Sequence, residues 1–375
     1  MTCPKCINPV VDDTLFCYGC GRFIAKGRKA SRILATVGKS VITAAAAVML
    51  LFLTTMAVSL TSALIWGSAY GMNAEELTEN IGRNTSLIVM VADLIALLVI
   101  LLASSVKKKS PVARLKVFFI RPAHVICFIV LGILLNYAVS VTVSLLPIPE
   151  AVMETHAEEF SYLSEITAAD IINTVFMTGI MEEIVFRAVM ILSLRKIIGR
   201  IPAVIVSAVI FSVSHGSLVS MGYSLLLGLL LGAVFVRYES VVPCIICHMA
   251  FNGASYLIAE VALPAEIMAG LYFTSIVLIL LLIWYLVVKY PSAYDLLLDF
   301  KKRIRWRNER EKAVIENVRA ADIDSVSADD FVRLTEAWRE ARRWTRKPAL
   351  PEGEDAKPEK EVTENGDIHK DDHTV

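Results

Sequence analysis

Four sequence signatures are missing from this chain, and their absence narrows the classes of protein to which it can belong. The sequence has no Gly-rich phosphate-binding loop and no H-E-x-x-H motif, so a zincin-type metalloprotease helix is excluded. It has no internal repeat, which disfavours a transporter built from two similar halves. The first apolar run begins only near Val41 and lacks a short apolar core followed by a cleavage site, so we interpret it as a membrane span and not as a secretion signal.

Charged residues are also scarce, because Asp, Glu, Lys and Arg make up 20% of the 375 residues whereas 56% are hydrophobic. The mean hydropathy of +0.60 is far above that of an ordinary soluble protein. The 37 basic and 37 acidic residues are crowded into the two ends and a few short loops. We therefore predict an all-α, polytopic membrane protein whose spans form a helical bundle.

Apolar runs of about 20 residues, the length that crosses a hydrocarbon core, recur along the chain. We predict about eight spans, at residues 41–66, 86–105, 123–146, 171–194, 202–218, 220–236, 241–259 and 265–288. The fifth and sixth are short and lie close together, with several glycines nearby. One of them is therefore a candidate for a broken or re-entrant segment, and seven spans is the alternative count.

The charges of the predicted loops indicate the orientation of the chain. With the N-terminus inside, the cytoplasmic loops carry nearly all the basic residues between spans: Lys107, Lys108, Lys109, Arg114, Lys116, Arg121, Arg195, Lys196, Arg200, Arg237 and Lys289. The outside loops carry Arg83 and are otherwise acidic. By the positive-inside rule, we predict a multi-pass protein of the cell membrane with both termini in the cytoplasm.

Four of the seven cysteines form two C-x-x-C pairs near the N-terminus, Cys3 with Cys6 and Cys17 with Cys20. Paired knuckles of this kind suit tetrahedral zinc, because each turn presents two thiolates to one ion. Two disulfides or a redox motif are the alternatives, but a thioredoxin-like motif would use one pair beside a βαβ pattern, and none is visible. We predict a structural zinc site in a zinc ribbon at residues 1–25, whose reduced thiolates agree with a cytoplasmic location.

The C-terminal part of the chain leaves the predicted membrane region after residue 290. Residues 301–312 are dense in Lys and Arg beside a span, a pattern typical of contact with an anionic inner leaflet, and we expect no nucleic acid as a partner. We predict cytoplasmic basic and amphipathic helices at 291–346 and a disordered tail at 347–375. The other predicted boundaries are a basic linker at 26–40, N-terminal transmembrane helices at 41–122 and a catalytic transmembrane domain at 123–290.

Glu182, Glu183 and Arg187 stand inside an otherwise apolar predicted span. One ionised side chain at the centre of a bilayer costs roughly 2.5–3.5 kcal/mol even on insertion scales, so such residues indicate a functional site. Glu183 and Arg187 are four residues apart and share a helix face, where their pairing offsets the desolvation of both. Glu182 points about 100° away and can face a cavity as a general base. A structural salt bridge is the alternative for Glu183 with Arg187, but it does not explain Glu182.

Two further predicted spans carry polar residues at a similar depth. His215 follows Phe211 by four residues in the fifth span, and His248 and Asn252 are four apart in the seventh. With Glu182 nearby, His215 can orient a water molecule or hold a metal, whereas His248 and Asn252 offer hydrogen-bond donors to a developing oxyanion. The structural alternative for each element alone is a hydrogen bond between helices. Three polar elements on three spans favour a hydrolytic centre inside the membrane.

Together, these residues resemble the motifs of the CPBP family, which comprises CAAX prenyl endoproteases and bacterial abortive-infection or bacteriocin-immunity-like proteins. Three motifs stand in the family's order on successive spans: Glu182-Glu183-x-x-x-Arg187, Phe211-x-x-x-His215 and His248-x-x-x-Asn252. The resemblance covers roughly residues 125–290 and extends to neither the Cys-rich N-terminus nor the tail.

The resemblance implies an all-helical intramembrane endopeptidase whose chamber opens toward the cytosol and the bilayer. It implies that Glu182 and His215 activate a water molecule and that His248 and Asn252 stabilise the oxyanion. Members of the family are often described as metalloproteases. A catalytic zinc held by Glu182, His215 and His248 is therefore an alternative to a water molecule held by Glu and His alone.

We therefore expect an intramembrane endopeptidase that hydrolyses peptide bonds of small or membrane-tethered substrates. Its expected partners are a peptide or membrane-protein substrate and the lipid bilayer, and its expected cofactor is the structural zinc of the N-terminal ribbon. A protein with a zinc ribbon need not meet prenylated substrates, so CAAX cleavage is less favoured than another target. The alternative is a non-catalytic membrane scaffold or bacteriocin-immunity-type binding protein, and a transporter is the third interpretation.

Overall fold

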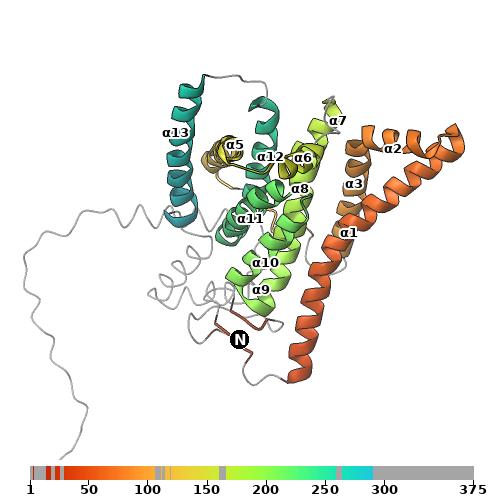
Figure 1. Cartoon of the computed structure of the whole chain (residues 1–375). Helices are drawn as coiled ribbons and strands as arrows, with labels where there is room; N and C mark the ends of the chain where they lie inside the picture. Colours follow the sequence, from red (N-terminus) through yellow and green to blue (C-terminus); the bar gives the residue numbers. More distant parts are fainter. Residues whose placement is uncertain are drawn as a thin grey trace, which may run out of the picture.

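The computed structural model describes residues 3, 14–17, 22–25, 29–105, 111, 115–118, 120–159, 166–258 and 264–289. Within these residues the named elements are helices, and a single β-bridge joins Phe16 to Phe23. Figure 1 shows the helices packed beside one another, with the long helix α1 (Ala30–Tyr70) running obliquely along one flank. The predicted helical fold is confirmed for this described part of the chain.

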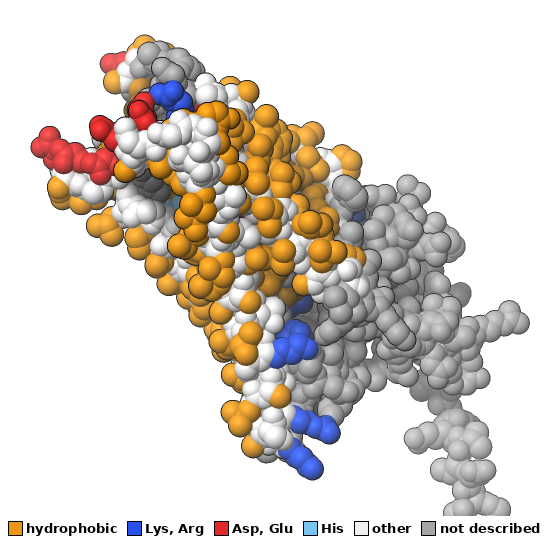
Figure 2. Space-filling model, turned by 90° about the vertical axis from the view of Figure 1, so that its right-hand side faces the viewer, with side chains coloured by type: hydrophobic (Ala, Val, Ile, Leu, Met, Phe, Trp, Pro, Cys, Tyr) orange, Lys and Arg blue, Asp and Glu red, His pale blue; other side chains and the backbone are white. Residues whose placement is uncertain are grey.

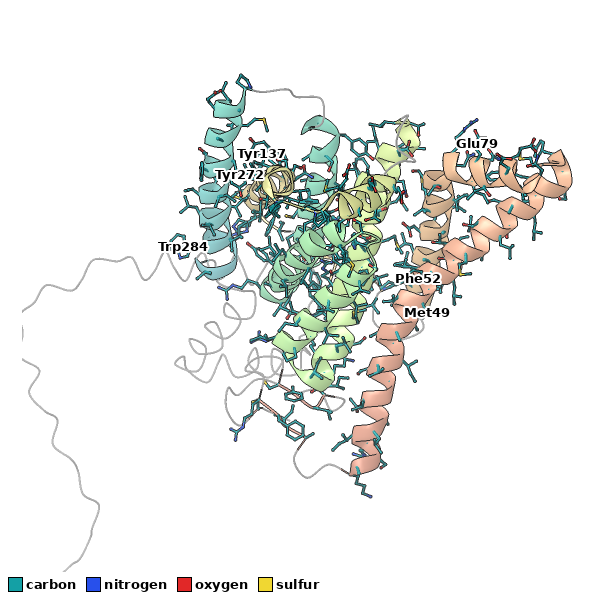
Figure 3. The ribbon with its side chains drawn as sticks, in the orientation of Figure 1. Met49, Phe52, Glu79, Tyr137, Tyr272 and Trp284 are labelled. Carbon is teal, nitrogen blue, oxygen red and sulfur yellow. The ribbon has the colours of Figure 1, made fainter. Side chains whose placement is uncertain are left out.

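Five helices are long and apolar enough to cross a membrane. They are α1, α3 (Thr85–Ser105), α5 (Pro122–Leu145), α11 (Leu218–Tyr238) and α13 (Ala265–Ile283), the last of which continues into the π-helical segment η4 (Trp284–Lys289). Each coincides with one predicted span. Their outer faces are apolar, as on α1, where the side chains of Met49 and Phe52 (Figure 3) are 52% and 54% exposed. Such faces suit contact with lipid.

The three other predicted spans are short or interrupted. α10 (Arg200–Val213) has 14 residues and α12 (Val242–Ile258) has 17. The fourth predicted span lies in a composite helix over residues 168–198, which we call the site helix. Its α-helical and π-helical segments alternate in the order α7 (Ala168–Ile171), η2 (Ile172–Thr178), α8 (Gly179–Glu182), η3 (Glu183–Ile191) and α9 (Leu192–Ile198). The count of about eight spans therefore stays a prediction.

Within the described part of the chain, two short helices, α2 (Ala74–Arg83) and α6 (Glu150–Glu159), carry most of the acidic residues outside the spans. α1 ends at Gly71, whose φ of 65° favours glycine, and Asn73 and Glu76 then form the capping box that starts α2. Figure 2 shows acidic side chains gathered at one end, most Lys and Arg side chains toward the other, and apolar side chains between them. This segregation agrees with the predicted orientation, and which end is cytoplasmic stays a prediction.

The backbones of α5 and α12 approach closely at Gly132. A Cβ atom at this position would lie 2.8 Å from Ala250 Cβ and 2.9 Å from the Phe251 nitrogen, and it would collide with the Cys247 carbonyl oxygen. A side chain would therefore force the helices apart, as at other small-residue contacts between membrane helices. The contact fixes the turn of α12 that carries His248.

α10 and α11 pack through a GxxxG pair, Gly228 and Gly232. A Cβ atom at Gly228 would lie 3.1 Å from Ala208 Cα, and one at Gly232 would lie 2.7 Å from Val204 Cγ1. The missing side chains let the two helices approach closely along one face. This packing positions the turn that joins them, where His215 lies.

α13 packs against α5 through hydrogen bonds of two tyrosines. Tyr137 donates its hydroxyl to the Met268 carbonyl oxygen at 2.9 Å, and the Tyr272 hydroxyl lies 3.0 Å from Thr142 Oγ1. Figure 3 shows the two tyrosines close together at this contact. Because a buried hydroxyl without a partner is costly, these bonds favour one register of α13 on α5.

Two short stretches near the N-terminus pair with each other and contact the site helix. The Ile24 N–H donates to the Leu15 carbonyl oxygen at 2.8 Å, next to the β-bridge between Phe16 and Phe23. The Leu15 N–H in turn donates to the Lys196 carbonyl oxygen at 2.7 Å. The N-terminal segment therefore rests on α9, at the end of the site helix.

The predicted zinc ribbon falls only partly within the described residues. Cys3 and Cys17 are buried, whereas Cys6 and Cys20 lie outside the described residues. Cys17 belongs to this pairing, because its N–H donates to the Arg22 carbonyl oxygen at 2.8 Å. The ribbon and its structural zinc stay a prediction.

Two predicted boundaries can be compared with the described residues. α1 begins at Ala30, so most of the predicted linker at 26–40 is helical, and the basic residues Arg32 and Lys39 lie on its first turns. Its small and aliphatic residues allow the helix to start well before the apolar run. The predicted helices at 291–346 and the predicted tail at 347–375 lie outside the described residues.

Candidate active site

The site helix is anchored at its start by Asp170. A capping box pairs Thr167 and Asp170 reciprocally, and Ser86 of α3 donates its hydroxyl to the same carboxylate. Burial raises the pKa of Asp170, but the hydrogen bonds from Ser86 and Thr167 outweigh burial and hold the pKa below its usual value. The carboxylate therefore ties α3 to the first turn of the site helix.

The two glutamates meet at a change of helix type, since Glu182 is the last residue of α8 and Glu183 the first of the π-helical η3. π-helical turns are rare and frequently occur at functional sites, because the wider turn redirects side chains. The change of winding falls between the two carboxylates, which then face different surroundings.

Glu183 is buried completely, with 0% of its surface exposed. Its Oε1 lies 2.9 Å from Nη1 of Arg187 and 2.8 Å from Nδ1 of His248. Arg187 and His248 are also buried. The expected contact between Glu183 and Arg187 is present, and the same carboxylate also holds the histidine of α12. The pairing offsets the high cost of burying each charge.

His248 lies between the two glutamates. A carboxylate oxygen only accepts hydrogen bonds, so Nδ1 of His248 carries the hydrogen that Glu183 binds. A neutral imidazole has one N–H, so Nε2 keeps a lone pair, and this atom lies 3.6 Å from Oε2 of Glu182. The Glu182 side chain is 20% exposed, whereas that of Glu183 is 0% exposed. Glu182 is therefore the carboxylate that a water molecule can reach.

The ring of Phe211 connects three polar side chains of the site. The guanidinium carbon of Arg187 lies 4.5 Å from the ring centroid, within the range of a cation–π contact. The centroids of the His215 and His248 rings lie 4.8 and 6.0 Å from it, both nearly edge-on. Phe211 therefore packs against both histidines and against the arginine.

His215 lies in the turn between α10 and α11 and is half-buried. Its Nδ1 is 2.8 Å from the Phe211 carbonyl oxygen, which only accepts, so Nδ1 donates and Nε2 keeps its lone pair in the neutral ring. α6 supports the same turn, because Nδ1 of His156 lies 2.9 Å from Ser217 Oγ. Like His248, His215 therefore presents an acceptor nitrogen, Nε2.

Glu182 contacts His248 and not His215. Among the described residues, no ion pair or hydrogen bond joins Glu182 to His215, which the resemblance had paired with it. The physical reason is packing: α12 touches the site helix at Gly179, where a Cβ atom would lie 3.2 Å from Met249 Cγ. α10 packs on η3 instead, where Ser207 donates its hydroxyl to the Phe186 carbonyl oxygen at 2.8 Å.

Asn252 makes a second polar contact between α12 and the site helix. Its Nδ2 donates to the Thr174 carbonyl oxygen of η2 at 2.8 Å. Because Asn252 is one turn beyond His248, the two contacts hold α12 at both ends of this turn. The amide is half-buried, and Asn252 lies on the same face of α12 as His248 because the two residues are four apart.

Asp93 of α3 was missed by the motif-based prediction. It is the one charged residue of α3, is 7% exposed, and interacts electrostatically with Glu182. The available signal was an acidic residue inside the predicted span 86–105, since ionisable residues in spans are functional candidates. The site therefore includes a carboxyl group from outside the three motifs.

The expected metal set does not fit this arrangement. Within the described residues no group of three His, Cys, Asp or Glu side chains is placed to hold a metal ion. Glu182 and Nε2 of His248 converge, but His215 reaches neither of them. The chemistry proposed for the site therefore uses the side chains alone, and a catalytic zinc stays a prediction.

The membrane-length helices and the buried charged centre define a multi-pass helical membrane protein with an enzyme-like site. Residues 164–254 match the family model Rce1-like, described as type II CAAX prenyl endopeptidase Rce1-like. This stretch contains all six predicted site residues. The predicted similarity to CAAX prenyl endoproteases is confirmed over these residues, which supports a membrane protease as the class. We found no match among curated proteins or solved structures.

Proposed function

We propose that this protein is an intramembrane endopeptidase that hydrolyses peptide bonds of small or membrane-tethered substrates. The observation that carries the proposal is the placement of Glu182 Oε2 3.6 Å from Nε2 of His248, while Glu183 holds the opposite ring nitrogen. A reachable carboxylate and an acceptor nitrogen side by side can take a proton from water. The match of residues 164–254 to a peptidase family supports the same reading.

The first step is attack by water. Glu182 accepts one proton of the water molecule while the water oxygen bonds to the carbonyl carbon of the substrate, and the carbonyl electrons move onto its oxygen. Nε2 of His215 accepts a hydrogen bond from the second hydrogen of the water and so orients it. The product of this step is a tetrahedral oxyanion.

The second step uses His248 as a donor. The proton passes from Glu182 to Nε2 of His248, and the imidazolium is stabilised by Glu183 at Nδ1. The new Nε2–H and the Asn252 amide then donate to the oxyanion, which is usually the largest electrostatic contribution in acyl transfer. When the C–N bond breaks, the amine nitrogen takes that proton, leaving a carboxylic acid and an amine.

This order of events explains why the histidine needs a buried carboxylate behind it. In the neutral ring Nε2 cannot donate, so an oxyanion site built from His248 requires the protonated form. Glu183 accepts the Nδ1 hydrogen of His248 and is itself paired with Arg187, so a carboxylate lies beside the ring when it gains a proton. The Glu183–Arg187 pair therefore positions His248 and stabilises the positive charge that its ring gains.

The experiment is an assay of the purified protein in lipid nanodiscs with a library of quenched fluorescent peptides. We expect hydrolysis by the parent and a loss of at least about 100-fold in kcat for Glu182→Gln and for His248→Gln, the usual contribution of general acid–base groups. Glu266→Gln, at an exposed residue of α13, is the matched control and should behave as the parent.

Prenylated and unprenylated versions of each peptide separate two substrate classes. Hydrolysis restricted to prenylated C-terminal sequences would assign the activity that the matched family model describes, whereas cleavage of both forms would assign a broader one. If the parent, Glu182→Gln and His248→Gln release no product or equal amounts of product, the site is not catalytic. Peptide binding without cleavage would then support the scaffold interpretation.

A further inference from the structure

Asp93 differs from the other carboxyl groups near the site in having no partner. Among the described residues no hydrogen bond or ion pair is formed by its side chain, although it is 93% buried, being 7% exposed. Asp170, on the same helix contact, is satisfied by Ser86 and Thr167. A carboxyl group with a structural role would be expected to have such partners, because an unpaired buried polar group is costly.

The packing of α3 directs Asp93 toward the site. Ser86 bonds to Asp170 and so fixes α3 beside the start of the site helix. Asp93 follows Ser86 by seven residues, two helical turns, and therefore lies on the same face of α3. Ala92 and Ala96 next to it are 0% exposed, so α3 approaches its neighbours closely at this level. This register agrees with the electrostatic influence of Glu182 on Asp93.

Glu182 and Asp93 are two carboxyl groups that form no ion pair with a Lys or Arg side chain among the described residues. Arg187 is paired with Glu183, and Glu182 lies 3.6 Å from the His248 ring, which Glu183 also holds. In a low-dielectric site two such carboxyl groups attract a positive charge from a ligand, because the ligand relieves both the burial and the mutual repulsion.

We propose that Asp93 forms a specificity subsite for a cationic group of the substrate, a Lys or Arg side chain or a free amine beside the scissile bond. This inference rests on the proposed peptidase function and names the substrate class that the same site selects. Asp93 contacts the substrate cation, whereas Glu182 handles the water. The subsite lies on α3, outside the residues that match the peptidase family model.

The test uses matched peptides that differ at one position, with Lys, Gln or Glu placed in turn on either side of the cleaved bond. For the parent we expect kcat/KM to be about tenfold higher with Lys than with Gln at the preferred position, an effect between those of exposed and buried ion pairs. In Asp93→Asn the Lys-to-Gln ratio should fall to about one, mainly through KM. Asp93→Glu should keep part of the ratio.

Glu266→Gln is the control for charge in general, since it removes one exposed carboxylate from α13 and should keep the parent ratio. An unchanged ratio in Asp93→Asn, or an equal loss with every peptide, would overturn the proposal and assign Asp93 a structural or positioning role. If the parent cleaves nothing, the peptidase function fails, and the subsite is still tested by peptide binding. Equal dissociation constants for the Lys and Gln peptides, measured by fluorescence anisotropy, would then overturn the subsite proposal.

Discussion

Two adjacent glutamates have opposite surroundings in this site, and the difference assigns their roles. Glu183 is enclosed, ion-paired with Arg187 and hydrogen-bonded to His248, whereas Glu182 is partly exposed and 3.6 Å from the same imidazole. A carboxylate held by two buried partners supports its neighbours, while the other remains available to water. Sequence adjacency therefore yields one supporting residue and one reactive residue.

Glu183→Gln should destabilise the protein far more than Glu182→Gln. Removing one partner of a buried ion pair leaves the Arg187 charge uncompensated, which typically costs about 3–5 kcal/mol. The measurement is thermal unfolding of both variants in the same detergent, where only Glu183→Gln should show a large fall in Tm. Equal Tm values for the two variants would contradict the assignment of Glu183 as the buried support.

At the scale of elements, the position of His248 depends on a contact between two helices. α5 and α12 touch backbone to backbone at Gly132, and α12 touches the site helix at Gly179. A rigid helix held at two close contacts places its polar side chains with little freedom. The geometry of the proposed site is therefore set in part by glycines that have no proposed chemical role.

Gly132→Ala should lower both stability and peptidase activity. The added Cβ would collide with the Cys247 carbonyl oxygen and lie 2.8 Å from Ala250 Cβ, and overpacking of this kind costs about 1–3 kcal/mol. The measurements are Tm and kcat of the purified variant.

Gly222→Ala is the matched control, because nothing lies within 4 Å of a Cβ placed there. Alanine is also favoured over glycine in a helix by about 1 kcal/mol, so this control should be as stable as the parent or slightly more stable. Equal losses in both variants would show that the α5–α12 contact has no special role.

How much could be predicted differs between elements. The five long apolar helices follow directly from hydropathy, because a run of about 20 apolar residues has few alternatives to a span. Hydropathy cannot predict the alternation of α and π turns in the site helix, because both kinds of turn bury the same apolar residues. Nor does it predict the start of α1 at Ala30, which lies before the apolar run. These features depend on backbone hydrogen bonding and tertiary packing.

The candidate site could also be predicted only in part from the sequence. The six motif residues were identified from polar residues in apolar spans, and the contact between Glu183 and Arg187 follows from their spacing. The choice of His248 as the neighbour of Glu182 depends on how close α12 comes to the site helix, which spacing along the chain does not encode. Asp93 was available to the same argument about charge in a span, but no motif drew attention to it.

At the scale of the whole molecule, the parts outside the matched segment include the Cys-rich N-terminal stretch and α3. The N-terminal stretch rests on α9 through the Leu15 N–H and the Lys196 carbonyl oxygen, whereas α3 lies beside the start of the site helix. Residues 164–254, which match the peptidase model, therefore stand between two accessory elements. The segment that matches the peptidase model is therefore separate in sequence from the N-terminal stretch and from α3.

Zinc analysis of the full chain tests the predicted ribbon. We expect about one zinc ion per chain in the parent, the content of a four-cysteine site, and almost none after replacement of Cys3, Cys6, Cys17 and Cys20 by serine. The measurement is elemental analysis of protein purified without added metal. Zinc that persists after these replacements would point to a second metal site, and the catalytic-zinc alternative would then become the one to test.

Phe211 places one ring in contact with a guanidinium and two imidazoles. A small apolar inhibitor that wedges this ring aside would displace both histidines and loosen the arginine in a single event. It would need no metal-chelating group and no mimic of the peptide bond. Compounds selected for this wedge would disable the site without competing for the position of the attacking water.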